Sequence, residues 1–301
     1  MIKSYLLLIP SLALWVSCGG EKKSTENVVT DTVVTDTTTA APALELVWST
    51  DTVFKTPESV IYDQERDIYY VSNVNGVPTD KDNNGFISKL KTDGTVDSLQ
   101  WITGLHAPKG MGIFKTSLFV TDIDKLVEID IEKGNIKKTY PVKGAQFLND
   151  VAIDTAGVVY FTDSGTNKIH TLKNGKVEEW KVNDTLNGPN GLYIEKDRII
   201  LSSMGTADLK AINIATKEST VLADSIGAGD GVEAMGGDGT YLVSDWYGQV
   251  FKVNPDNTKE LLTDTRPVNK NAADIEYVKD KNLLLVPTFG ANKVEAYKVN
   301  R

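Results

Sequence analysis

The chain has 301 residues, 41% of them hydrophobic and 24% charged, with one cysteine and a formal net charge of −9. The acidic balance argues against nucleic acid and against anionic lipid as main partners, and it is compatible with the binding of cations. A single cysteine excludes an internal disulfide.

The N-terminus predicts an export signal over residues 1–17. Lys3 precedes an apolar stretch from Tyr5 to Val16, which is too short to span a bilayer as a mature helix. Cys18 follows this stretch, and its position resembles the lipobox of bacterial lipoproteins. The resemblance implies a lipidated Cys18, a chain anchored to a membrane, and a location in the bacterial envelope on a periplasmic or cell-surface face. The alternative is an ordinary cleaved signal and a soluble protein with one free thiol.

Residues 18–43 predict a disordered tether. The segment is rich in Thr, Asp, Val and Ala, and it contains the sequence VVTDT twice, from Val28 and from Val33. Such a composition buries too little apolar surface to order the chain. Strand-like sequence begins at Leu44, and we expect one folded domain over residues 44–301.

Six similar segments recur along this domain. They are PESVIYD from Pro57, PKGMGIF from Pro108, LNDVAID from Leu148, PNGLYIE from Pro189, GDGVEAM from Gly229 and AADIEYV from Ala272. Their second residues lie 51, 40, 41, 40 and 43 positions apart. A period of about 40 residues accommodates one four-stranded antiparallel sheet and is typical of β-propellers. The repeat therefore predicts an all-β, six-bladed β-propeller.

The third repeat shows the strands of one blade. It contains VAID, VVYFTDS, KIHTL and KVEEWKV between residues 151 and 182, with Gly, Asn or Asp at the turns. The second strand of each blade is apolar on both faces, as expected for a strand covered by neighbouring sheets. No stretch of about 12 or more residues predicts an amphipathic helix, which argues against an alternating β/α barrel.

The last repeat has only three strands and ends near Val299. The segment Leu44–Thr50 has strand composition and precedes the first repeat. We expect this segment to pair with the C-terminal strand and to close the ring, because closure removes exposed sheet edges.

In this topology each first strand begins on the face where the second strand ends, so distant residues meet at one mouth of the central channel. The second positions of four blades carry oxygen donors: Glu58, Asn149, Asn190 and Asp230. The ends of the second strands form a wider rim: Asn73, Asp122, Asp163, Ser203, Asp245 and Thr288.

Four further residues are candidates for substrate binding. Lys109 occupies the second position of blade two and could hold an anionic substrate, although a structural or solvated lysine is the alternative. Asp122, Asp163 and Asp245 belong to the rim. For these three the alternative is local, because Asp at a strand end commonly satisfies turn amides.

Two carboxylates and two amide oxygens suit a hard divalent cation. Ca²⁺ takes about 6–8 oxygen ligands and accepts neutral carbonyls beside Asp and Glu. Without a cation, Glu58 and Asp230 would repel each other in a concave site. Zn²⁺ fits less well because no histidine or cysteine joins the set. We therefore expect a divalent cation, with Ca²⁺ favoured, held by Glu58, Asn149, Asn190 and Asp230.

The segments PESVIYD, LNDVAID, PNGL and GDGV resemble the metal-binding segments of the senescence marker protein/gluconolactonase family, also called regucalcin-like. The resemblance implies a six-bladed propeller with a divalent ion at the channel mouth and, for several members, lactone hydrolysis. It also implies that the ion polarises a lactone or ester carbonyl while Asp230 is the catalytic base that activates water. Phe147 departs from the pattern, since the family often has a substrate-holding arginine at that place.

Two functions from different classes follow. The first is an exported, membrane-anchored, metal-dependent hydrolase of the gluconolactonase type, which opens a small lactone or related ester and acts as a monomer. The second is a non-catalytic propeller that binds a ligand or a protein partner around a structural cation. The complete set of four oxygen donors favours the first function, and Phe147 favours the second.

A separate loop resembles the start of an EF-hand. Asp80, Asp82 and Asn84 in DKDNNGFI have the spacing that opens such a Ca²⁺ loop. Lys91 stands where the bidentate Glu would be and cannot ligate Ca²⁺. The alternative to a second ion site is a polar loop at the mouth.

Overall fold

The computed structural model describes residues 43–182 and 185–300. They belong to one compact unit, Ala41–Arg301. The predicted export signal, Cys18 and the tether up to residue 42 lie outside the described residues, so these stay predictions. Among the residues described, no helix is both long enough and apolar enough to cross a membrane.

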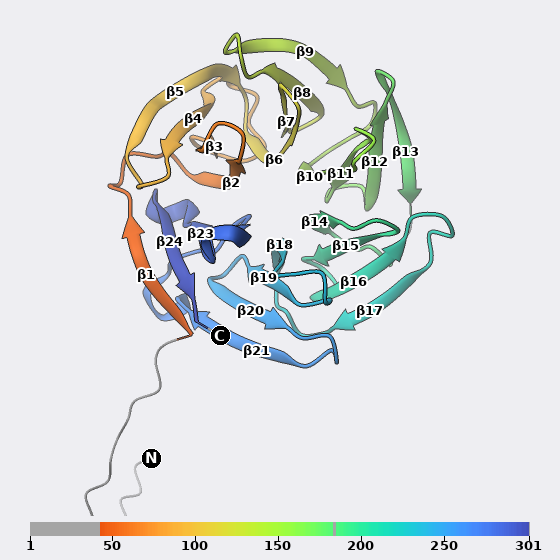
Figure 1. The fold of residues 1–301 in the computed structure, drawn as a ribbon. Coiled ribbons are helices and arrows are strands. Elements are labelled where there is room, and N and C mark those ends of the chain that lie inside the picture. Colours follow the sequence, from red (N-terminus) through yellow and green to blue (C-terminus); the bar gives the residue numbers. More distant parts are fainter. Residues whose placement is uncertain (1–42, 183–184, 301) are drawn as a thin grey trace, which may run out of the picture. The chain divides into compact units, whose positions relative to one another are not determined.

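Six four-stranded antiparallel sheets surround a central axis, which confirms the predicted six-bladed β-propeller (Figure 1). Blades one to three are β2 (Pro57–Asp63), β3 (Ile68–Asn73), β4 (Gly85–Lys91), β5 (Val96–Leu105); β6 (Pro108–Phe114), β7 (Ser117–Asp122), β8 (Lys125–Asp130), β9 (Asn135–Pro141); and β10 (Leu148–Ile153), β11 (Val159–Asp163), β12 (Lys168–Lys173), β13 (Lys176–Val182). Blades four and five are β14 (Pro189–Ile194), β15 (Arg198–Ser203), β16 (Asp208–Asn213), β17 (Ser219–Ala223); and β18 (Gly229–Ala234), β19 (Tyr241–Asp245), β20 (Gln249–Val253), β21 (Lys259–Asp264). Blade six holds β22 (Glu276–Val278), β23 (Leu283–Pro287), β24 (Val294–Val299) and β1 (Leu44–Ser49), and the three short 3₁₀ helices are η1 (Arg266–Val268), η2 (Lys279–Lys281) and η3 (Phe289–Ala291).

Strand β1 closes the ring, as the sequence predicts. It pairs antiparallel with β24, from Leu44 opposite Val299 to Ser49 opposite Glu295. Blade six therefore joins the first strand of the chain to the last three, and its outermost strand is β1 (Figure 1). This arrangement ties both ends of the domain into one sheet.

The hydrophobic core lies between neighbouring sheets. Between blades one and two, for example, buried Tyr70 and Ile87 pack with Leu118 and Val127. The second strands β7, β11, β19 and β23 are buried at every residue. Their all-apolar centres follow from contact with a sheet on each side. Outer strands such as β9 are mostly exposed.

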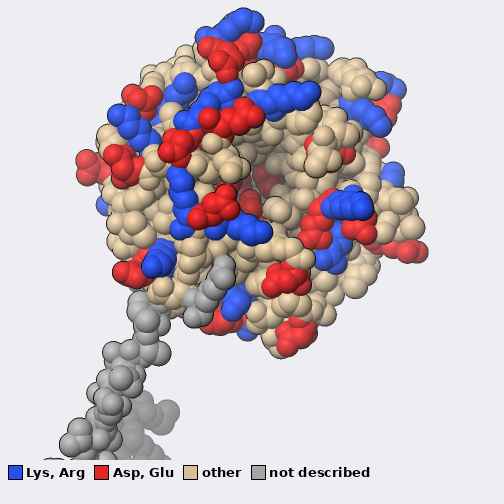
Figure 2. Space-filling model, in the orientation of Figure 1, with Lys and Arg blue, Asp and Glu red and all other residues tan. Residues whose placement is uncertain are grey.

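A β-bulge opens five of the six innermost strands. In each case the first residue pairs with the last residue of the second strand, and the register then shifts. In blade three, for instance, Leu148 faces Asp163 and the shift falls between Leu148 and Val151. Because a bulge redirects side chains, the second residue of each entering strand is turned toward the axis. Figure 2 shows the central hollow of the face seen in Figure 1, with acidic side chains visible inside it.

Candidate functional site

A cavity of about 100 Å³ lies where the bulges converge. Its polar lining consists of the four predicted oxygen donors and Lys109, from five different blades: Glu58, Lys109, Asn149, Asn190 and Asp230. Its other lining residues are apolar: Val74, Pro78, Phe147, Met204, Trp246 and Phe289. We call this cavity the mouth pocket. The structure thus brings together all four residues that the sequence nominates for a cation, together with Lys109.

Hydroxyl side chains hold the second residues of neighbouring blades in place. The hydroxyl of Thr162, on β11, donates to the carbonyl of Asn190 at 2.9 Å, and it accepts the amide of Asp150 in its own blade at 2.9 Å. Equivalent donations link the other blades: Thr121 to the Asn149 carbonyl, Ser202 to the Asp230 carbonyl, and Ser244 to the Ala273 carbonyl. These bonds form a hydroxyl ladder around the channel.

The members of the hydroxyl ladder were not predicted. Each lies one residue before a rim position, and each is 0% exposed. The sequence carries a signal, since SN, TD, TD, SS and SD end the second strands of blades one to five. The sixth blade has Pro287 at this position. In this blade a backbone amide replaces the hydroxyl as the donor: the Asp274 amide donates to the Glu58 carbonyl at 2.9 Å.

Three buried oxygens in the mouth pocket have no hydrogen-bond partner. They are Glu58 Oε2, Asn190 Oδ1 and Asp230 Oδ1, and their residues are 5%, 2% and 1% exposed. Asn149 is 4% exposed, and its amide nitrogen donates to Ser164 Oγ at 3.4 Å, which leaves its carbonyl oxygen for a ligand. An unpaired buried oxygen costs about 1–3 kcal/mol, and more when it is charged. Oxygen acceptors contributed by several blades are the ligand set that a hard cation requires.

Burial makes two of these carboxyls hard to ionise. It raises the pKa of Glu58 well above its usual value, and the negative charge of Asp230 raises it further. Burial likewise raises the pKa of Asp230, helped by the charge of Asp274, although Asn190 opposes this with a hydrogen bond. A divalent cation would offset both effects, because an opposite charge at short range stabilises the ionised form.

A metal site here depends on the two asparagines. Among the described residues, no three His, Cys, Asp or Glu side chains are grouped as metal ligands would be. The mouth pocket holds only two carboxylates within a set of four oxygen donors. The residues present therefore fit Ca²⁺, which accepts amide oxygens, better than Zn²⁺.

Lys109 is buried in the wall of the mouth pocket. It is 1% exposed, and its Nζ donates to the carbonyls of Pro78 at 3.1 Å and Ala107 at 3.0 Å. The same nitrogen lies 4.4 Å from the ring centre of Phe147. Burial lowers its pKa to about 8. Lys109 thus stands beside the place where the sequence departs from the arginine of the resembling family.

The three rim carboxylates lie outside the mouth pocket. Asp122 is fully buried and accepts the backbone amides of His106 and Ala107 at 2.8–3.0 Å. Asp163 accepts the Phe147 amide at 2.9 Å, and Asp245 accepts that of Ala228 at 2.8 Å. Each carboxylate thus fixes the loop that leads into the first strand of its own blade. These contacts are the local alternative considered from the sequence, and substrate binding by the three stays a prediction.

The role of Asp163 predicts a pH-dependent contribution to stability. Burial raises its pKa, but hydrogen bonds outweigh this and hold the pKa at about 2. The lowering comes from His170, whose Nε2 lies 3.9 Å away, from the Thr166 hydroxyl at 2.6 Å and from the Phe147 amide. A folded pKa below the unfolded value means that the stabilisation is present above pH ~4 and is lost toward pH ~2.

We therefore expect Asp163→Asn to flatten the acid limb of the stability curve. Between pH 5 and pH 3 the free energy of unfolding of the parent protein should fall by about 1 kcal/mol more than that of the variant. Urea unfolding at the two pH values measures this difference. Asp97→Asn, at an exposed position on β5, is the control. Parallel curves for the parent protein and Asp163→Asn contradict the assignment.

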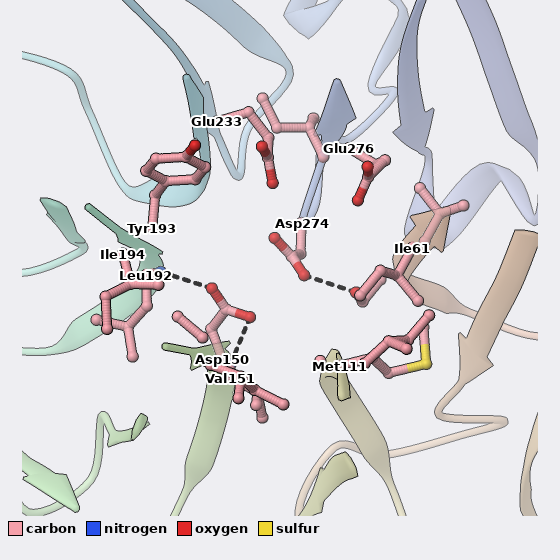
Figure 3. Close-up of a pocket in the computed structure, with 17 residues that line it drawn as sticks. Ile61, Met111, Asp150, Val151, Leu192, Tyr193, Ile194, Glu233, Asp274 and Glu276 are labelled. Carbon is pink, nitrogen blue, oxygen red and sulfur yellow. Dashed lines mark hydrogen bonds between the residues drawn. The ribbon is translucent and has the colours of Figure 1, made fainter. Parts of the chain in front are cut away.

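A second cavity of about 210 Å³ lies further along the innermost strands. Four carboxyl groups point into it, those of Asp150, Glu233, Asp274 and Glu276 (Figure 3). Burial raises the pKa of Asp274 to about 7 and that of Glu276 to about 8, and it raises the other two as well. The sequence analysis missed these residues. They occupy third and fifth positions of the entering strands, where other blades carry Gly, Ser or apolar residues.

The loop that resembles the start of an EF-hand is closed by its own side chains. The carboxylate of Asp82 accepts the Asn84 backbone amide at 3.2 Å and the Asn84 side-chain amide at 2.6 Å. The Asn83 amide donates to His106 Nδ1 at 3.2 Å. These contacts are compatible with the polar loop considered from the sequence, and a second ion site stays a prediction.

Comparisons with known proteins support the fold. No protein-family model matches the chain, and no curated protein matches it. A streptogramin B lyase structure superposes with a TM-score of 0.63 at 14% identity, covering 85% of this chain and 97% of that one. A catalytically inactive His-to-Ala variant of virginiamycin B lyase from Staphylococcus aureus with quinupristin has a TM-score of 0.61 at 13% identity, over 85% and 99% of the two chains. Selenomethionine-substituted virginiamycin B lyase from the same organism has a TM-score of 0.62 at 12% identity, over 85% and 100%.

At these identities the likeness shows the fold alone. The six-bladed propeller of the sequence-based resemblance is confirmed, while the gluconolactonase family stays a prediction. The solved structures are similar to this chain as propellers; all three are named as lyases, and one of them contains quinupristin.

Proposed function

We propose that the protein is a metal-dependent hydrolase of the gluconolactonase type, which opens a lactone or related ester in the mouth pocket. The observation that carries the proposal is the set of unpaired buried oxygens of Glu58, Asn190 and Asp230 at the floor of an open cavity. With Asn149 they would hold a divalent cation, Ca²⁺ in preference. A bound cation supplies Lewis-acid polarisation of the substrate carbonyl.

The other tasks fall to the chain itself. Asp230 is the catalytic base: its carboxylate takes a proton from water as the water oxygen adds to the carbonyl carbon. The ring C–O bond then breaks, and the proton returns to the departing alkoxide to give a hydroxy acid. Glu58, Asn149 and Asn190 position the reacting groups, and the apolar wall limits the entry of bulk water.

A second candidate is a non-catalytic propeller in which the same cation is structural. The apolar Phe147 in place of a substrate-holding arginine favours it. A histidine-based elimination has less support, although one similar structure is an inactive His-to-Ala lyase variant. The described residues that line the mouth pocket include no histidine.

A lactone panel assayed with Ca²⁺ and with EDTA separates the two candidates. We expect hydrolysis with Ca²⁺, its loss in EDTA, and a decrease of about 10³-fold in kcat for Asp230→Asn, because one group both binds the cation and takes the proton. Asp97→Asn should retain the parent rate. Calcium binding without turnover of any lactone or ester would leave the binding propeller as the function.

The lipid anchor completes the proposal. Support comes from the apolar segment before Cys18 and the absence of any other cysteine. We expect a labelled fatty acid to be incorporated by the full chain when expressed in bacteria and to be absent from Cys18→Ser. Equal labelling of the two chains contradicts the anchor, and it leaves the proposed reaction untouched.

A further inference from the structure

The walls of the mouth pocket differ in chemistry from its floor. Every polar side chain that lines it belongs to the four oxygen donors or to Lys109. The remaining lining side chains come from segments that flank the strands: Val74, Pro78, Phe147, Met204, Trp246 and Phe289. None of these six side chains carries a hydroxyl, carboxylate or amide. Their only strong hydrogen-bonding group is the indole N–H of Trp246. A ligand thus meets polar groups at its reacting end and apolar surface around the remainder.

The aromatic part of this wall is held in a fixed arrangement. The rings of Trp246 and Phe289 meet edge to face, with centroids 4.6 Å apart and an interplanar angle of 65°. Asn271 ties their two loops together, because its Nδ2 donates to the Trp246 carbonyl at 3.0 Å and its Oδ1 accepts the Gly290 amide at 3.3 Å. Such pairing and cross-linking pre-organise an apolar surface for a ligand.

Phe289 adopts a backbone conformation that a bulky side chain rarely takes. It begins η3 with φ +38°. Its ring packs against the buried cluster of Val74, Ala107 and Ile123, which joins the loop after β23 to blades one and two. Left-handed backbone at a non-glycine residue costs about 1–3 kcal/mol, and such residues are concentrated at ligand sites. The chain thus tolerates strain that places an aromatic ring at the mouth.

Lys109 does not make the wall polar. Two of its three donors are used on the carbonyls of Pro78 and Ala107, and its Nζ stands over the face of Phe147. It fixes the loop that carries Pro78 and supports the aromatic wall. A sugar lactone would place several hydroxyl groups against these surfaces. Each hydroxyl would lose its hydrogen bonds to water without a replacement.

From these observations we infer that the mouth pocket selects lactones or esters with an alkyl or aryl group over polyhydroxylated sugar lactones. Phe147, Trp246 and Phe289 are the residues that determine this specificity. The reaction itself rests on the proposed function, whereas the substrate class rests on the pocket walls. An apolar wall favours an alkyl group over a hydroxylated one by about 10²-fold.

Two δ-lactones with the same six-membered ring test the inference. One carries a pentyl substituent and the other is glucono-δ-lactone, and both are assayed with the full chain saturated with Ca²⁺. We expect kcat/KM for the pentyl lactone to exceed that for the sugar lactone by about 100-fold. Phe147→Asn and Trp246→Asn should reduce this ratio at least about tenfold, mainly through KM. Phe147→Leu should retain it.

Tyr247→Asn is the matched control. Tyr247 is the neighbour of Trp246 in sequence, is 63% exposed and does not line the mouth pocket. Its replacement should leave the ratio of the two lactones unchanged. A loss of preference in Tyr247→Asn equal to that in Trp246→Asn overturns the assignment of the wall.

A binding measurement separates failure of the inference from failure of the reaction. The two corresponding δ-lactams resist hydrolysis, and their binding can be followed by tryptophan fluorescence, with Trp246→Phe identifying the responding residue. Tighter binding of the pentyl lactam without turnover of either lactone supports the inference and refutes the reaction. Calcium-dependent hydrolysis that favours glucono-δ-lactone refutes the inference and supports the reaction. If the pentyl lactam does not bind more tightly than the sugar lactam, the inference is wrong.

Discussion

Calcium should raise the melting temperature of this protein, and replacement of Asp230 by asparagine should remove that increase. A ligand at 100 times its Kd stabilises the folded state by about 2.7 kcal/mol. For a domain of this size that corresponds to roughly 5–10 °C. Asp230 has the lowest exposure among the four oxygen donors, at 1%, and one of its oxygens is unpaired. Differential scanning calorimetry with Ca²⁺ and with EDTA measures the effect.

The same variant should behave in the opposite way in EDTA. Without a cation the parent protein buries unpaired charge, so Asp230→Asn should melt at a higher temperature than the parent. In Ca²⁺ the order should reverse. Asp97→Asn, which changes an exposed carboxylate on β5, should have the melting temperature of the parent in Ca²⁺ and in EDTA. If the parent protein melts at the same temperature in Ca²⁺ and in EDTA, the proposed cation site is wrong.

The raised pKa values of Glu58 and Asp230 give these effects a pH dependence. A carboxyl whose folded pKa exceeds its unfolded pKa binds protons more tightly in the folded state. In EDTA its contribution therefore destabilises the fold as pH rises above ~4, the unfolded value. Calcium must displace those protons, so the stabilisation by calcium should grow as pH rises. Proton release on calcium addition, measured in weakly buffered solution, reports the same exchange.

The second large effect is expected for Gly191→Ala. A Cβ at this glycine would lie 2.0 Å from the Asp230 carbonyl oxygen and 2.8 Å from Ser202 Oγ. Strands β14 and β18 would have to separate, and the bond from Ser202 to the Asp230 carbonyl would be lost. We expect a loss of about 3 kcal/mol or more in the free energy of unfolding, together with weaker calcium binding.

Gly237→Ala is the control for this substitution. A Cβ at Gly237 has no neighbour within 4 Å, and this glycine has no left-handed φ. Chemical unfolding should therefore give a free energy within about 0.5 kcal/mol of the parent value. Failure of Gly191→Ala to fold while Gly237→Ala folds is the extreme form of the expected result. Equal stability of the two variants contradicts it.

The fold could be predicted from the sequence because the repeats have a regular length and because equivalent positions can be recognised within each of them. Equivalent positions such as Asn149 and Asn190 are separated by one blade, so periodicity alone brings them to one depth. The partner of Leu44 could be predicted because the last repeat lacks a strand. The pairing of β1 with β24 confirms this reasoning.

Other parts of the site could not be read from the sequence. The bulge shifts the register by one residue, which changes the side chains that face the channel beyond it. Asp150, which lies within the bulge of β10, therefore enters the second cavity although alternation from the second position points it away. Likewise, Ser202 and Ser244 repeat visibly in the sequence, but their bonds to the next blade depend on the approach of separate sheets.

The position of β1 has a practical consequence for handling this protein. Its start at Leu44 lies beside Val299 on the perimeter of blade six, away from the axis (Figure 1). Reporters or surfaces attached next to Leu44 or Val299 would leave the mouth accessible to dissolved small molecules. The neighbouring ends also make the ring a good candidate for circular permutation, in which the two termini are joined and the chain is opened at an exposed hairpin.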